Sequence, residues 1–304
     1  MQIWMINISL KTDMKDLDYN NFIKEKKPFP YFSIENFFDE IFSKNLKKEF
    51  LEIYENEISK FYNKKESIFK KTDSGNLDYD KSFYIGGGKE KDSLKLFLQL
   101  SQKYPYLDKL IKKINNQKFT DYIFNLLEKK VLWKKNVLRD PNYKLNFFEF
   151  IFFNNFYINF KISYFKNKSG LALHRDHGGK EIALLYYLGF SDNLTRKKGG
   201  TQLYKKLSKT KYQDHNIEED KLNDFIKIFD HEPKNNSLLG FKRTENSWHA
   251  VEQMELPLDV VRMNLQINFM RLDDLKYSSI LVEKLKYRIV NFKLFLFKII
   301  NNEN

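Results

Sequence analysis

Short apolar segments separated by polar turns dominate the second half of this 304-residue chain. Phe, Ile, Tyr, Leu and Val cluster at 147–153, 156–165, 182–189, 201–205, 236–241 and 260–270. Turn sequences such as KNKSG, DHGG and KKGG separate these segments. Several short strands broken by glycine-containing turns are typical of a β-sandwich or a jelly roll. We therefore predict a β core for this part of the chain.

The first half of the chain has apolar residues at the three-to-four spacing of amphipathic helices. A short strand is predicted at Tyr31–Ile34, because the prolines before it favour extended backbone, and a helix from about Phe38. The segments LKLFLQL and FTDYIFNLLEKKVLW predict two further helices, near 91–103 and 116–133. The stretch around Pro105 is expected to separate these two helices.

Together these patterns predict an α+β chain with a double-stranded β-helix (jelly-roll) core that N-terminal helices buttress. The expected regions are an N-terminal strand and helical support at 1–144, the jelly-roll core at 145–271 and a basic amphipathic helix at 272–304. Polar residues at 60–90 and 207–232 predict two loops, the second with a short helix.

The predicted C-terminal helix has one apolar face and one basic face. Leu281, Leu285, Ile289, Phe292 and Leu296 form the apolar face, whereas Lys284, Arg288 and Asn291 lie on another. One interpretation is a helix that packs on the core or on a second subunit. The other is a helix that binds peripherally to an anionic membrane surface.

Composition narrows the chemistry that the chain can perform. The net charge of +13 attracts phosphates, anionic lipids or anionic glycans, although a general drift toward lysine explains the same excess. Because the chain has no cysteine, any metal ion must be held by nitrogen and oxygen ligands. The N-terminus does not resemble a signal peptide and no apolar run is long enough to span a bilayer, so we predict a cytoplasmic protein.

The stretch LHRDH places His174 and Asp176 two residues apart. In an extended segment such side chains project to the same side, so an imidazole and a carboxylate can bind one ion. His-x-Asp arises often by chance, but NSWHAVEQ adds His249 downstream, and VVRMNLQINF places Arg262 inside an apolar strand. Two histidines and one carboxylate match the ligand set that leaves open positions on ferrous iron. A buried arginine needs an anionic partner, which the distal carboxylate of a dicarboxylic co-substrate would supply.

The order of these motifs resembles the iron(II)- and 2-oxoglutarate-dependent dioxygenases, in particular their prolyl-hydroxylase-like branch. The residues that carry the resemblance are LHRDH, LLYYLGF, GGTQLY, SWHAVE and VVRMNL. The similarity covers roughly residues 28–271 and is strongest over 164–271. It implies that residues 145–271 form a catalytic core that binds Fe(2+), 2-oxoglutarate and O2. The implied reaction hydroxylates a substrate and decarboxylates 2-oxoglutarate to succinate.

The resemblance also implies roles for individual residues. The implied iron ligands are His174, Asp176 and His249, and the residues implied to bind 2-oxoglutarate are Arg262, Tyr187 and Tyr164. Members of the family often have Ser or Thr two residues after the arginine, where this chain has Asn264. Whether Asn264 contacts 2-oxoglutarate is therefore open.

The remaining histidines are predicted to lie outside the metal site. His177 follows Asp176 directly and is expected to point to the opposite face, as a residue of the loop. His215 and His231 lie in the charged segment 207–232 and are expected to be solvated.

The substrate is open at this point, because neither a fold nor a metal site determines it. The candidate substrates are prolyl or other side chains of a protein partner and glycan-type small molecules. Two alternatives do not involve oxygenase activity: a basic nucleic-acid-binding protein and a peripheral membrane protein that uses the C-terminal helix. Nucleic acid is the less expected partner, because the basic residues are spread along the chain and form no nucleic-acid-binding motif.

Overall fold

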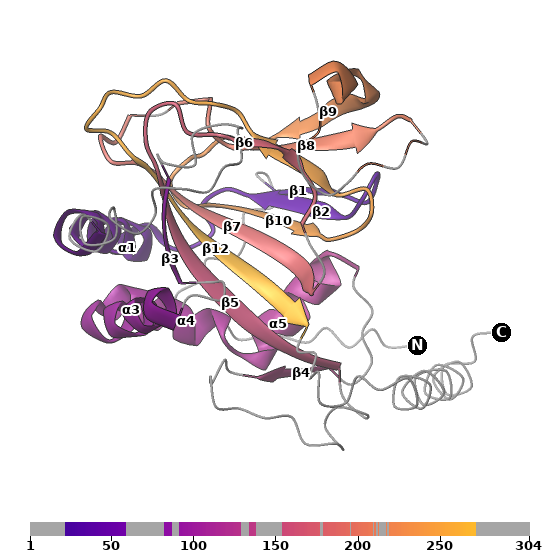
Figure 1. The fold of residues 1–304 in the computed structure, drawn as a ribbon. Helices are drawn as coiled ribbons and strands as arrows, with labels where there is room; N and C mark the ends of the chain where they lie inside the picture. The colour runs from indigo at the N-terminus through magenta and orange to yellow at the C-terminus, as the bar shows by residue number, and fades with distance from the viewer. Residues whose placement is uncertain are drawn as a thin grey trace, which may run out of the picture.

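The computed structural model describes residues 22–58, 82–86, 91–128, 134–137, 154–176, 179–194, 196–208, 210, 212, 217 and 219–271. Within these residues the chain is a mixed α+β protein in which helices cover one face of a large sheet and a smaller sheet lies against the other (Figure 1).

The larger sheet has the strand order β1-β2-β10-β7-β12-β5-β3, and β4 pairs with β5. Its strands are β1 (Phe22–Glu25), β2 (Tyr31–Ile34), β3 (Ser82–Gly86), β4 (Lys134–Val137), β5 (Asn154–Phe165), β7 (Lys180–Phe190), β10 (Ser237–Lys242) and β12 (Arg262–Arg271). All neighbours in this sheet are antiparallel except β4 and β5. The long strands β5, β7 and β12 form its centre, and the apolar side chains on their helix-facing side belong to the main core.

The smaller sheet has the order β6-β11-β8-β9. Its strands are β6 (Leu171–His174), β8 (Thr201–Lys206), β9 (Phe225–Asp230) and β11 (Trp248–Val251). From β5 to β12 the chain passes repeatedly from one sheet to the other, which is the connectivity expected of the predicted jelly roll. Segments far apart in sequence therefore meet between the sheets.

Within the described residues, the α-helices cover the outer face of the larger sheet (Figure 1). They are α1 (Glu40–Ile53), α3 (Lys91–Lys103), α4 (Pro105–Ile114) and α5 (Gln117–Leu126). The carboxylate of Asp39 caps α1 by accepting a hydrogen bond from the backbone N–H of Phe42 at 2.8 Å. Buried Glu49 of α1 accepts the backbone N–H groups of Tyr106 and Leu107 at 2.9 and 2.8 Å, which ties α1 to the first turn of α4. None of these helices, nor any other in the described residues, is long and apolar enough to cross a bilayer.

Most predicted elements of the first half are confirmed, with shifted boundaries. The strand at Tyr31–Ile34 and the helix at 91–103 have the predicted bounds, and the helix expected from Phe38 begins at Glu40. The helix predicted at 116–133 ends at Leu126. The stretch around Pro105 does separate the two predicted helices, but it also begins a helix that was not predicted: α3 ends at Lys103, and Pro105 occupies the first turn of α4, where a missing backbone N–H costs nothing.

The second half follows the predicted pattern, and three short strands add to it. The segments 156–165, 182–189 and 201–205 lie within strands, the segments 236–241 and 260–270 overlap β10 and β12 except at their first residues, and β6, β9 and β11 were not among the predicted segments. The segment 207–232 does contain the expected short helix, at Glu219–Asp224, but it ends in strand β9 rather than in a loop. The predicted loop at 60–90 contains strand β3. The segment 147–153 and the predicted helix at 272–304 lie outside the described residues.

One core joins the two sides of the predicted boundary at residue 144. The main cluster of buried side chains includes Phe42 and Phe50 of α1 together with Leu184 of β7 and Leu265 of β12. Strand β2 also pairs directly with β10. The N-terminal helices therefore support the sheet by sharing its core, and residues 1–144, 145–271 and 272–304 stay predicted regions of the sequence.

His231 is buried, contrary to the expectation that it is solvated. Only 3% of its surface is exposed. Its ring lies between Ser33 of β2 and Ser237 of β10. The hydroxyl of Ser237 donates to the backbone carbonyl of Lys234 at 2.8 Å, so its oxygen accepts from Nε2–H of His231 at 3.1 Å. Nδ1 then accepts from the hydroxyl of Ser33 at 3.0 Å. Both ring nitrogens are satisfied only when the ring is neutral.

Acid is therefore expected to destabilise the fold through His231. Burial lowers its pKa to about 3, so below the ordinary value of about 6.5 the unfolded chain binds a proton that the folded chain does not. The contribution is complete above pH 6.5 and is lost as the pH falls toward 3, at up to about 1.4 kcal/mol per pH unit. Urea unfolding of wild type and His231→Gln between pH 7 and pH 4 measures this slope. Parallel curves for the two proteins would contradict the assignment.

Candidate metal centre

Two histidines face each other across paired strands of the smaller sheet. His174 ends β6, His249 lies in β11, and the two are direct partners in the strand register. Their ring centroids are 4.2 Å apart. Nδ1 of His174 contacts the carbonyl oxygen of Ala172 at 2.8 Å, and Nδ1 of His249 contacts that of Ser247 at 3.0 Å. A carbonyl can only accept, so both Nδ1 atoms carry the proton and both Nε2 atoms carry a lone pair suited to bind a metal.

Asp176 completes the cluster from the turn that follows β6. One ligand atom from each of His174, Asp176 and His249 lies within 4.8 Å of the others. Oδ2 of Asp176 is 3.9 Å from Nε2 of His249 and is buried without a hydrogen bond among the described residues. A buried carboxylate oxygen is costly without a partner. The donor set of two imidazole nitrogens and one carboxylate oxygen fits a divalent transition metal ion such as Fe(2+).

The charge states of the cluster suit metal binding at neutral pH. Burial, with a contribution from nearby His249, lowers the pKa of His174 to about 3, so this imidazole is neutral. Burial on its own raises the pKa of Asp176, but the charge of Lys180 and the nearby imidazoles outweigh it and hold the pKa below the usual range. A neutral imidazole and an ionised carboxylate are the forms that coordinate metals.

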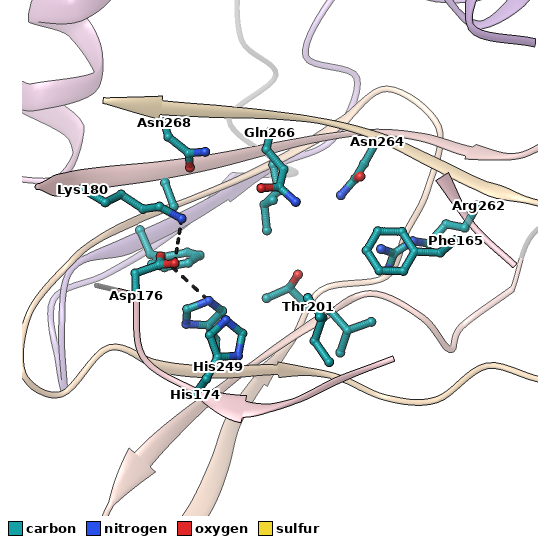
Figure 2. A pocket seen from close by; sticks show the side chains of 15 residues that line it. Phe165, His174, Asp176, Lys180, Thr201, His249, Arg262, Asn264, Gln266 and Asn268 are labelled. Carbon is teal, nitrogen blue, oxygen red and sulfur yellow. Dashed lines mark hydrogen bonds and ion pairs between the residues drawn. The ribbon is translucent and has the colours of Figure 1, made fainter. Parts of the chain in front are cut away.

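The cluster opens into a pocket between the two sheets. Figure 2 shows His174, Asp176 and His249 toward one end of the pocket and Arg262 with Phe165 at the other. Thr201 lies on the wall formed by the smaller sheet, opposite Asn264 and Gln266 of β12. The pocket is therefore elongated, with a metal-binding end and a cationic end.

Arg262 places its charge inside the protein, with 1% of its surface exposed. Its guanidinium donates to the backbone carbonyl of Gly199 and lies 3.9 Å from the centre of the Phe165 ring. The ring of Tyr187 is 5.7 Å away. Packing against Phe165 holds the planar group in one orientation, as binding a carboxylate through two parallel hydrogen bonds requires.

Tyr187 lies beside the pocket near the cationic end. Its buried hydroxyl shares a hydrogen bond of 2.7 Å with the hydroxyl of Thr201, which lines the pocket. Burial raises the pKa of Tyr187, and the charge of Arg262 opposes this effect. The sequence placed Tyr187 near the co-substrate; in the structure it reaches the pocket through Thr201.

Tyr164 lies on the wrong face of the larger sheet for its predicted role. Its side chain points toward α1, where its hydroxyl donates to the backbone carbonyl of Phe50 at 2.8 Å and its ring packs on Tyr54. Strand residues alternate between faces, so the next residue, Phe165, lines the pocket instead. The prediction that Tyr164 contacts the metal or 2-oxoglutarate is therefore wrong.

Tyr164→Phe tests this correction. Loss of one buried hydrogen bond is expected to lower the free energy of unfolding by about 1 kcal/mol, although the Phe50 carbonyl keeps the backbone N–H of Tyr54 as a second donor. Metal and 2-oxoglutarate affinities are expected to stay at their wild-type values. Urea unfolding and Mn(2+) titration of the same preparation give both readings. A loss of co-substrate affinity without a loss of stability would restore Tyr164 to the site.

Besides Asn264, whose role the sequence left open, the pocket contains residues that the sequence did not identify as part of a site. Strand β12 contributes Asn264, Gln266 and Asn268 at alternate positions after Arg262, and β7 contributes Lys180. The alternation of polar and apolar residues in RMNLQINFMR is visible in the sequence and indicates a polar face. Oδ1 of Asn264 is buried without a hydrogen bond among the described residues. His177 and His215 lie outside the described residues.

No protein-family model matches the chain, and no curated protein matches it. Among solved structures, it is similar to a prolyl-4-hydroxylase from Pseudomonas putida, at 12% identity over 80% of this chain and 88% of that one, with a TM-score of 0.36. It is also similar to EctD from S. alaskensis, which was crystallised with 2-oxoglutarate and 5-hydroxyectoine, at 10% identity over 83% and 72% of the two chains, with a TM-score of 0.42.

A third match is a 2OG-Fe(II) oxygenase family oxidoreductase from Burkholderia pseudomallei, at 11% identity and a TM-score of 0.32. It covers 55% of this chain, and this chain spans 59% of that one. The solved structures to which this chain is similar thus include 2-oxoglutarate- and Fe(II)-dependent oxygenases, at identities and TM-scores too low to identify a reaction or a substrate.

Proposed function

We propose that this protein is an Fe(II)- and 2-oxoglutarate-dependent dioxygenase that hydroxylates a polar substrate. The observation that carries the proposal is the cluster of half-buried His174 with buried Asp176 and His249, which shares one pocket with the guanidinium of Arg262. A metal site alone fits many functions. A three-residue metal site that opens toward a buried arginine fits a metal ion and a dicarboxylate bound side by side.

In this proposal His174, Asp176 and His249 hold the iron, which supplies activation of O2 when 2-oxoglutarate is bound. Three protein ligands leave open positions for the co-substrate and for O2. The contacts of both Nδ1 atoms with backbone carbonyls set the direction of the two rings before any ligand arrives. The protein contributes this geometry and a pocket enclosed between two sheets.

Arg262 binds the distal carboxylate of 2-oxoglutarate in this proposal. Its guanidinium is buried and held by Phe165, so little orientational freedom is lost when a carboxylate binds. Thr201 and Asn264 line the space between Arg262 and the metal ligands. The buried Oδ1 of Asn264 makes no hydrogen bond among the described residues, and its amide can rotate to present either a donor or an acceptor to a ligand.

The walls of the pocket favour a substrate that makes hydrogen bonds. Gln266 and Asn268 line one wall, and Ala183, Leu185 and Phe241 line another. Asn268 is buried, where an amide is costly unless it is hydrogen-bonded, whereas Gln266 is half-buried and donates to the hydroxyl of Ser163 at 3.3 Å. A glycan-type small molecule or a protein side chain next to its own backbone amides offers hydrogen bonds to one wall and C–H groups to the other.

Anaerobic titration of the purified protein with Fe(2+) and 2-oxoglutarate tests the proposal. Chelation of the metal by the oxoacid is expected to give a weak visible charge-transfer band. The band should be absent in His174→Ala, which lacks one ligand. A folded wild-type protein that retains no metal and gives no band would remove the oxygenase proposal.

A further inference from the structure

Lys180 contacts the candidate metal site from outside the ligand set. It is the first residue of β7 and lies four residues after Asp176. Its ammonium donates to Oδ1 of Asp176 at 2.6 Å, and the exposed fractions of the two side chains are only 20% and 11%. The other oxygen, Oδ2, faces Nε2 of His249 at 3.9 Å. The carboxylate thus has a cation on one oxygen and the metal-binding imidazoles beside the other (Figure 2).

The backbone fixes Lys180 in this position. Gly179 has a φ of +89°, which turns the chain from Asp176 into β7. Lys180 pairs with Met270 of β12 at a register shift, and this irregularity brings the lysine side chain to the pocket side of the sheet. Arg243 holds the turn from the other side, because its Nε donates to the backbone carbonyl of Asp176 at 2.9 Å.

We propose that Lys180 competes with the metal ion for the negative charge of Asp176 and so lowers the metal affinity of the site. This inference rests on the proposed metal-binding function. Asp176 contributes a single negative charge, which a half-buried lysine and a divalent ion would have to share. The two cations also repel each other across one carboxylate, in surroundings where charges are screened weakly.

A second effect of Lys180 would raise the metal affinity instead of lowering it. A hydrogen bond from an outer residue to a ligand orients it, and outer partners of this kind commonly raise metal affinity. Those partners are usually neutral or anionic, whereas Lys180 carries a full positive charge. Repulsion between a single and a double positive charge on one buried carboxylate exceeds the benefit of ordering one short side chain. The net effect of Lys180 is therefore a weaker metal site.

Mn(2+) titration, in which electron paramagnetic resonance detects the free ion, tests whether Lys180 lowers or raises the metal affinity. Lys180→Met is expected to bind Mn(2+) at least about 10-fold more tightly than wild type, since outer-residue substitutions change metal affinity about 10–100-fold. Lys180→Arg keeps the charge and is expected to stay within about 3-fold of wild type. Lys205→Met is the matched control, because it removes the charge of an exposed lysine in β8 that does not line the pocket.

A second measurement tests the ion pair without any metal. In the presence of a chelator, Lys180→Met is expected to unfold at lower urea than wild type, because Asp176 keeps a buried charge with no cation beside it. In an Asp176→Asn background the same lysine substitution is expected to have little effect. Lys180→Gln replaces Lys180→Met in both measurements if the methionine variant does not fold.

The outcomes separate the inference from the proposed function. A wild-type protein that binds no Mn(2+) removes the proposed function. A wild type that binds Mn(2+) while Lys180→Met binds it equally or more weakly overturns the inference and leaves the proposed function intact. Weaker binding in the variant would make Lys180 a residue that orients Asp176.

Discussion

Asp176→Ala is expected to remove metal binding and turnover, and it is the substitution with the largest expected effect. Asp176 is the only anionic member of the candidate ligand set. Two unit charges 4 Å apart interact by about 4 kcal/mol at an effective dielectric constant of 20, so losing the carboxylate weakens divalent metal binding by at least about 1000-fold. Mn(2+) titration and succinate formation from 2-oxoglutarate measure the two consequences.

The fold is expected to survive this change, because Asp176 lies in a turn at the edge of the pocket. Asp192→Ala is the matched control: it removes another carboxylate that is paired with a basic residue four positions away, Arg196. The control should keep wild-type metal affinity. If Asp176→Ala retained tight metal binding, another residue would have to be the anionic ligand, and the proposed site would be wrong.

Arg262→Gln is expected to weaken 2-oxoglutarate binding on the order of 100-fold, because truncating a buried, hydrogen-bonded charge partner costs about 2–5 kcal/mol. Metal affinity should stay within a few-fold, since Arg262 lies at the other end of the pocket from His174, Asp176 and His249. Isothermal titration of the Mn(2+)-loaded protein with 2-oxoglutarate separates the two affinities.

Arg262→Lys distinguishes charge from geometry at the same position. Lysine keeps the positive charge but cannot make two parallel hydrogen bonds to one carboxylate, so an intermediate affinity is expected. Arg196→Gln is the matched control, because Arg196 also lies over an aromatic ring, that of Phe190, but does not line the pocket. Equal loss of metal and 2-oxoglutarate affinity in Arg262→Gln would indicate structural damage instead of a lost anchor.

The position of Tyr164 illustrates where sequence reasoning reached its limit. The motif order associated it with the site, but the face on which a strand residue lies depends on register, and a shift of one residue exchanges the two faces. Tyr164 is buried against α1, and Phe165 occupies the pocket wall. In a chain with 18 Tyr and 29 Phe, the sequence offers no signal for which aromatic residue faces which layer.

The burial of His231 also could not be predicted from its neighbours in the sequence. Its neighbours in sequence are polar and indicate a solvated loop, whereas Ser33 and Ser237, which satisfy its ring, lie in β2 and β10. A histidine is buried when partners from other strands satisfy it, and those partners are 198 and 6 residues away. Only the pairing of β2 with β10 places them around the ring.

Local pattern determined the elements and the candidate ligands of this protein. Apolar periodicity located most strands and helices, and the two-residue spacing of His174 and Asp176 predicted a shared side. Tertiary structure alone decided that β11 pairs with β6 so that His249 meets His174, and that a turn and a register shift bring Lys180 onto Asp176. Spacing along a chain constrains neighbours on one strand, whereas contacts between strands depend on which strands pair and in which register.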